Sequence, residues 1–229
     1  MRQLSKGKRR VTGLLGAGAL LIGGVGAPVV FAAGPASAAP CTATITAPCA
    51  ITGTATLGAG TLTATLPDTL TWTGTLTGTT QELVDAVHAD QGFVVDDASG
   101  ATDGWNVSLT ATQFSSTVPT TAQLPADGTF SMTGSTADNT AITAPTAACT
   151  SGTGTCILPN DGGVTYPVAL ATDGTATVVY EAAANTGEGS IDIGGSAAAD
   201  PVGWWLAVRP DAAPGTYTST VTISVASGP

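Results

Sequence analysis

The chain has 229 residues, of which 43% are hydrophobic and 10% are charged. Five of its six basic residues lie within residues 2–10, so residues 39–229 hold one arginine, no lysine and all 16 acidic residues, a net charge of 1 − 16 = −15. Such a charge repels polyanionic nucleic acid and anionic membrane surfaces, which excludes both as partners. In an exported protein, the acidity serves solubility.

The N-terminal residues have the three parts of a secretory signal peptide. The basic residues 2–10 are followed by an apolar run over residues 11–33 and by the small-residue cleavage site Ala36-Ser37-Ala38. We expect cleavage after Ala38, a secreted chain of residues 39–229 and no membrane insertion after cleavage. A retained membrane anchor is the alternative, but glycines, Pro28 and Pro35 interrupt the apolar run.

The four cysteines form two closely spaced pairs, Cys41 with Cys49 and Cys149 with Cys156. An even number of cysteines in an exported chain predicts disulfides, and the two local pairings are the preferred connectivity. A zinc site is the alternative, but both spacings are wider than zinc-binding cysteine pairs use. We therefore expect no metal and no cofactor at these residues.

Alternation of apolar residues with threonine dominates the chain. Residues 70–77 are the clearest case, with Leu70, Trp72 and Leu76 on one face and threonines on the other. Successive side chains of a strand point to opposite faces, so this pattern predicts a half-buried strand. The same alternation predicts strands at residues 61–66, 105–111, 164–170 and 217–225.

Helical spacing is almost absent. Only residues 80–89 fit a helix, with Thr79 and Glu82 as a capping box, and an irregular strand is the alternative. Many short strands separated by Gly, Pro, Asn and Asp predict an all-β protein. We expect an antiparallel β-sandwich, immunoglobulin-like or related, with little or no helix. Residues 39–229 would form one domain, with a surface excursion at about 133–160.

Few residues suggest a catalytic or metal-binding role. His88 is the only histidine, and no serine occupies a Gly-x-Ser-x-Gly turn. Asp96 and Asp97 are adjacent and would point apart on a strand, so a paired-carboxylate hydrolase is not expected. The acidic loop that contains Asp97 and Asp103 is a weak calcium candidate, and an ordinary Asp/Gly turn is the alternative. We predict that the protein is not an enzyme.

Residues 202–209 are the tryptophan-rich segment Val-Gly-Trp-Trp-Leu-Ala-Val-Arg. As a strand, this segment would direct Trp204 to the core and Trp205 to the other face, where Arg209 also lies. An exposed ring with small neighbours suits the apolar face of a sugar, and Arg209 could meet a carboxylate. Trp205 and Arg209 are therefore candidate sugar contacts. Packing of Trp205 under a loop is the alternative.

Two segments resemble the motifs of WxL-domain cell-surface proteins. Gly104-Trp105-Asn106-Val107-Ser108-Leu109 resembles their proximal Trp-x-Leu motif, with Val107 in place of the leucine. The C-terminal segment resembles the distal motif in spacing, with Tyr217 at its start and with Ile223 and Val225 in place of the tryptophan and leucine. The resemblance covers about residues 52–229. These positions are either binding residues or a core signature, because Trp-x-Leu has the period of a strand.

The resemblance implies a non-enzymatic protein of Gram-positive cell surfaces that binds the cell wall, through peptidoglycan or another wall polymer, non-covalently. We expect no covalent anchor at the C-terminus. A second hypothesis is a structural or assembly subunit that binds other surface proteins, which would need an exposed strand edge or apolar patch. A secreted hydrolase is the third.

Overall fold

The computed structural model describes residues 55–85, 87–117, 121–150 and 155–229. This part of the chain is built from antiparallel strands, and its only helical element is the short 3-10 turn η1 (His88–Asp90), so the predicted all-β class is confirmed. The expected signal peptide and the Cys41–Cys49 pair lie outside the described residues. Within them, no helix is long and apolar enough to cross a bilayer.

The strands follow one another closely along the chain. They are β1 (Leu62–Thr65), β2 (Gln81–Val84), β3 (Phe93–Asp97), β4 (Trp105–Ala111), β5 (Ser115–Ser116), β6 (Ala122–Gln123), β7 (Phe130–Thr133), β8 (Ala147–Cys149), β9 (Val168–Leu170), β10 (Thr177–Ala182), β11 (Gly189–Ile193), β12 (Gly203–Val208) and β13 (Val221–Ser227).

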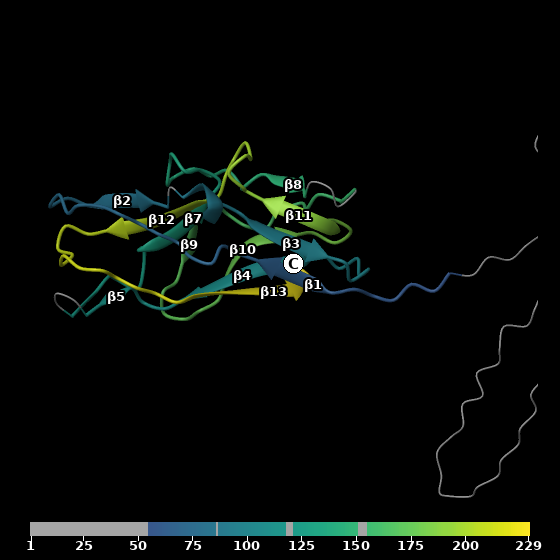
Figure 1. Cartoon of the computed structure of the whole chain (residues 1–229), viewed down its shortest axis with the longest axis horizontal. Coiled ribbons are helices and arrows are strands. Elements are labelled where there is room, and N and C mark those ends of the chain that lie inside the picture. The colour runs from purple at the N-terminus through teal and green to yellow at the C-terminus, as the bar shows by residue number, and fades with distance from the viewer. Residues whose placement is uncertain (1–54, 86, 118–120, 151–154) are drawn as a thin grey trace, which may run out of the picture. The chain divides into compact units, whose positions relative to one another are not determined.

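Three sheets and one small hairpin share these strands. Their orders are β1-β3-β11-β8, β10-β4-β13 and β2-β12-β7-β9, and β5 pairs with β6. Figure 1 shows β2, β12, β7 and β9 together at one end of the described unit, with β3, β11, β4 and β13 at the other. β1 and β13 are both edge strands, and they lie close together without pairing to each other.

Aromatic rings fill the space between the sheets. Phe93 of β3 meets Tyr180 of β10 edge to face, and Trp105 of β4 stacks on the same tyrosine. A second cluster joins Trp72, Phe114 and Phe130, with ring centroids 5.6–5.9 Å apart. Edge-to-face contacts of this kind add to the stabilisation from apolar burial. The sheets therefore share one apolar core.

The predicted strands at 61–66, 105–111 and 202–209 correspond to β1, β4 and β12, while only parts of 164–170 and 217–225 pair, as β9 and β13. The helix considered for residues 80–89 is wrong. β2 and η1 occupy this range, as the alternative of an irregular strand implied, because Gln81–Val84 pairs with β12.

The prediction of a half-buried strand over residues 70–77 is also wrong. Leu70 and Trp72 pack against the core while Thr71 and Thr73 are exposed, so the alternation holds there, but Leu76, expected on the same buried face, is 41% exposed. Yet these residues belong to no sheet. A strand needs a neighbour for its backbone hydrogen bonds, and no described strand pairs with this segment.

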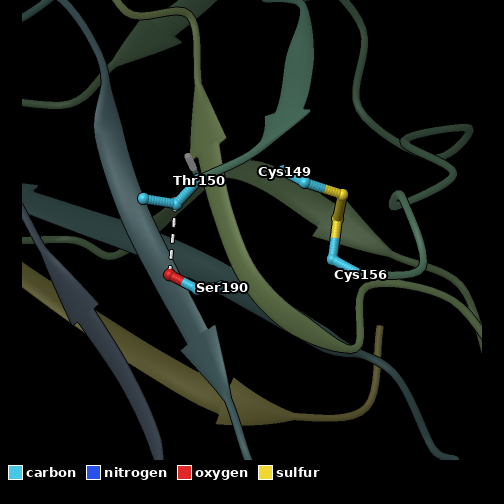
Figure 2. The surroundings of a disulfide bond; sticks show 4 residues. All are labelled: Cys149, Thr150, Cys156 and Ser190. Atoms are coloured by element: carbon cyan, nitrogen blue, oxygen red, sulfur yellow. Dashed lines mark hydrogen bonds between the residues drawn. A yellow bond between two sulfur atoms is a disulfide. The ribbon is translucent and has the colours of Figure 1, made fainter. Parts of the chain in front are cut away.

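The Cys149–Cys156 disulfide is confirmed, with the two Cα atoms 5.6 Å apart. Figure 2 shows it beside β11, where the Ser190 hydroxyl bonds to that of Thr150 at 3.2 Å. Cys149 is the last residue of β8, which pairs with β11, and Ile157 donates its N–H to Glu188. The disulfide thus closes a loop within the excursion expected at 133–160, and β8 ties that excursion to a sheet.

Candidate binding groove

Residues 66–76, named here the unpaired segment, carry the pattern of a strand without the pairing of one. Leu66, Leu70 and Trp72 pack against the core. The backbone of this segment makes no backbone–backbone hydrogen bond to any described residue. Most of its N–H and C=O groups are therefore open to solvent or to a ligand.

Side chains hold the unpaired segment in place instead. The buried carboxylate of Asp85 accepts the N–H of Thr71 at 2.7 Å and that of Val87 at 2.9 Å. The Trp72 indole donates to the carbonyl of Trp204 at 2.9 Å. Gln81 donates to the carbonyl of Thr75 at 2.9 Å. Three side-chain bonds thus fix an extended chain that no strand supports.

Residues 212–223 form the facing wall. Tyr217 is half-buried and donates its hydroxyl to the carbonyl of Ala213 at 2.8 Å, which fixes the turn before β13. Thr218 exchanges backbone hydrogen bonds with Ser115, and β13 pairs only with β4. These described bonds all run to one side, so the other edge of β13 is unpaired.

A groove of about 1270 Å³ lies between these two walls. Its lining is mainly aliphatic and aromatic, with threonine and serine hydroxyls among the apolar side chains. The large apolar lining residues are Leu66, Leu70, Trp72, Leu76, Leu83, Phe114, Leu124, Leu206, Val208, Tyr217, Val221 and Ile223. An exposed apolar channel of this size marks a binding site more often than an ordinary surface feature.

The groove is nearly uncharged although the chain is strongly acidic. Asp68 is its only charged lining residue. The nearby carboxyl of Asp90 has its pKa raised by burial and by the charges of Asp85 and Asp68. No group of metal-binding side chains occurs among the described residues. The groove therefore presents an apolar and uncharged polar surface, with one carboxylate, Asp68.

The residues of the Trp-x-Leu resemblance divide between the core and the groove. Trp105 and Val107 are fully buried, and the Trp105 indole donates to the carbonyl of Gly187 at 2.8 Å. A Cβ at Gly187 would lie 2.5 Å from that indole nitrogen. Tyr217 and Ile223 line the groove, while Val225 packs against the core from β13. Trp105 and Val107 thus act in packing.

Trp205 is not the exposed sugar platform that the sequence suggested. Its side chain is only 6% exposed, and its indole donates to the carbonyl of Ser135 at 2.9 Å, so the alternative of packing under a loop holds. Both faces of β12 are covered, which strand alternation alone cannot reveal. Arg209 is exposed and pairs with Asp211 at 3.4 Å.

The acidic loop does not assemble a calcium site. Asp97 is buried and uses one carboxylate oxygen to accept both the N–H and the hydroxyl of Ser99, at 3.0 and 2.6 Å. Asp103 is exposed and belongs to no metal-binding group within the described part of the chain. The arrangement around Asp97 is that of an Asx turn, as the alternative proposed. His88 lies in η1.

Sequence reasoning missed the groove, although one feature indicated it. Residues 70–77 show the strongest strand alternation in the chain, and the structure gives them no partner. An unpaired backbone with the side-chain pattern of a strand is the kind of feature to which an extended peptide can add as a strand.

Comparison of the chain with protein-family models, with curated protein sequences and with solved structures found no match.

Proposed function

We propose that this chain is a non-enzymatic, exported protein of the bacterial cell surface that holds an extended polypeptide in the groove. This is the function of an assembly subunit that binds other surface proteins. The observation that carries it is the unpaired segment, whose backbone has no backbone partner beside an aliphatic groove. Strand addition would satisfy this backbone, while the groove would take alternate side chains of the added strand.

The lining favours a polypeptide over a sugar. Leu66, Leu70, Leu83, Leu206 and Val208 supply branched aliphatic surface, which suits aliphatic side chains. Sugar sites rely on open aromatic faces together with fixed polar groups. In the groove, the Trp72 ring packs edge to face on Phe114 and Phe130, and its N–H is already bonded to Trp204.

Non-covalent binding of peptidoglycan or another wall polymer is the second candidate. The threonine and serine hydroxyls along the groove favour it, since residues 69, 71, 73, 75, 216, 218 and 219 all line the groove. The near absence of charge there also means that an anionic polymer would meet only Asp68. In this case the WxL resemblance would extend to function, with Tyr217 and Ile223 as contacts.

Hydrogen exchange measured by mass spectrometry distinguishes polypeptide binding from wall-polymer binding. We would record exchange over residues 66–76 for the exported protein alone, with purified wall sacculi and with a blocked, uncharged Thr/Val peptide. Strand addition protects these amides because it gives them acceptors. Protection by the peptide supports the polypeptide proposal, protection by sacculi alone supports wall binding, and no protection in either mixture contradicts both.

The variant Leu76→Asp adds a control for location. Leu76 lines the groove, is 41% exposed and is not among the residues packed against the core. Val178 is also 41% exposed but lies on β10, outside the groove. Leu76→Asp is expected to abolish protection, whereas Val178→Asp is expected to preserve it.

A further inference from the structure

A second unpartnered apolar feature lies at the other end of β1. Leu57 is 92% exposed, and residues 55–59, which lead into β1, are exposed throughout. Within the described residues, backbone hydrogen bonds begin at Gly60, which donates to Ala98, and Ala98 donates to Thr61. An isolated leucine on an extended, solvent-exposed chain is apolar surface without a partner.

Residues 50–59, named here the arm, have the composition that the groove requires. Residues 11–67 contain no Asp, Glu, Lys or Arg, so the arm is neutral in a strongly acidic protein. Its sequence, Ala-Ile-Thr-Gly-Thr-Ala-Thr-Leu-Gly-Ala, alternates small or apolar residues with threonine. As a strand, it would place Ile51, Ala55 and Leu57 on one face and threonines on the other.

We propose that the arm of one copy adds as a strand along the unpaired segment of a second copy, with Ile51 and Leu57 in the groove. The proposal rests on the polypeptide-binding function above and names its occupant. The unpaired segment would gain backbone partners, and the aliphatic lining would cover the two largest apolar side chains of the arm. Charge favours this contact, because two acidic bodies would join through neutral surfaces.

The positions of the arm and the groove favour a second copy over the same chain. The arm precedes β1 in the chain, whereas the groove lining begins at Leu66, after β1. To fill its own groove, the arm would have to reverse at Gly60 and use about six residues to return along β1. A second copy needs no reversal.

The contact would be head-to-tail, because each copy offers one arm before β1 and one groove after it. Successive contacts of this kind build a filament, or a ring where the rotation between copies closes. Added salt would strengthen the assembly, because it screens the repulsion between the acidic bodies while leaving the apolar contact intact.

The test uses the exported protein, with its N-terminus defined by mass spectrometry, in sedimentation velocity over a wide concentration range. The wild type is expected to form concentration-dependent chains. Leu57→Asp is expected to weaken association at least about tenfold, because the added carboxylate would be buried in the groove without a partner. Thr56→Asp adds the same charge on the opposite face, and it is expected to retain association. Both residues are exposed, so neither change threatens the fold.

A mixing experiment then identifies the geometry. Leu57→Asp keeps an intact groove, and Leu76→Asp keeps an intact arm, so each is expected to be monomeric alone. Their mixture is expected to give a one-to-one dimer and nothing larger, because only one productive contact remains. Val178→Asp is the matched control for Leu76→Asp and should assemble as the wild type does.

Three outcomes would overturn the proposal: a monomeric wild type, association unaffected by Leu57→Asp, or a mixture that stays monomeric. A monomer whose residues 66–76 lose protection from exchange on Leu57→Asp would show that the arm fills its own groove. If copies do not associate but the Thr/Val peptide still protects residues 66–76, the groove binds polypeptide and only its occupant has been misassigned.

Discussion

The carboxylate of Asp85 accepts the backbone N–H of Thr71 at 2.7 Å, across 14 residues of sequence. A side chain here takes the place that a neighbouring strand takes elsewhere in the protein. Asp85 is fully buried and also accepts the N–H of Val87. Asp85 therefore supplies one of the three side-chain hydrogen bonds that hold this wall of the groove.

Replacement of Asp85 by alanine is expected to release this wall. Two charge-assisted hydrogen bonds would be lost and their N–H groups left unsatisfied, at a cost of about 3 kcal/mol in the free energy of unfolding. Asp85→Asn keeps one oxygen acceptor and should cost about half as much. Urea denaturation measures both. Wild-type stability in both variants would show that the carboxylate does not hold the segment.

Local alternation explains which parts of this fold could be predicted. Residues 105–111 became a central strand because Trp105, Val107 and Leu109 form a continuous apolar face. Residues 70–77 have an equally clear face and no partner. Alternation encodes which side chains are buried, whereas pairing depends on segments distant in sequence. The groove follows from that difference, so it could not be predicted from the pattern alone.

Trp205 illustrates the same limit within the candidate site. The alternation correctly separates it from Trp204 on β12, but coverage of its face by Ser135 is a tertiary contact. The same limit applies to the positions of the Trp-x-Leu resemblance. Trp105 and Ile223 both lie on the apolar face of an alternating segment, and only the structure assigns Trp105 to the core and Ile223 to the groove.

The Cys149–Cys156 disulfide is expected to stabilise the excursion that it closes. It spans seven residues, and loop entropy predicts a contribution of about 2 kcal/mol. The double variant Cys149→Ser with Cys156→Ser should lower the free energy of unfolding by that amount. Substitution is preferable to a reductant, which would also act on Cys41 and Cys49. No loss of stability would mean that β8 pairing with β11 alone secures this region.

Stability should depend on pH through Asp161. The half-buried carboxyl accepts the Tyr166 hydroxyl at 2.5 Å and the N–H of Glu181 at 3.1 Å. Burial raises its pKa from 3.8 to about 6, against the hydrogen bonds, which lower it, with a smaller upward contribution from Glu181. The folded state thus binds a proton more tightly than the unfolded state. The associated stabilisation is complete below pH 3.8 and is lost as pH rises through about 6.

We expect this loss to be about 1 kcal/mol, below the full linkage value, because solvent screens a half-buried group. Asp161→Asn cannot titrate but keeps an acceptor oxygen. The difference in unfolding free energy between wild type and this variant should therefore fall between pH 4 and pH 7, in step with the pKa shift. If the unfolding free energies of the wild type and Asp161→Asn changed in parallel with pH, the pH dependence could not be assigned to Asp161. Asp161→Ala, which loses both hydrogen bonds, should be less stable than Asp161→Asn at every pH.

Trp205→Ala provides the sharpest contrast between packing and binding. The side chain is buried and its indole is bonded to Ser135, so truncation should cost about 3 kcal/mol through cavity formation and an unpaired carbonyl. The folded fraction should still bind as the wild type does, because Trp205 does not line the groove. Leu76→Asp should do the opposite, with near-normal stability and lost binding. Denaturation and hydrogen exchange with the Thr/Val peptide test both variants. Lost binding by folded Trp205→Ala, with intact binding by Leu76→Asp, would move the site from the groove to β12.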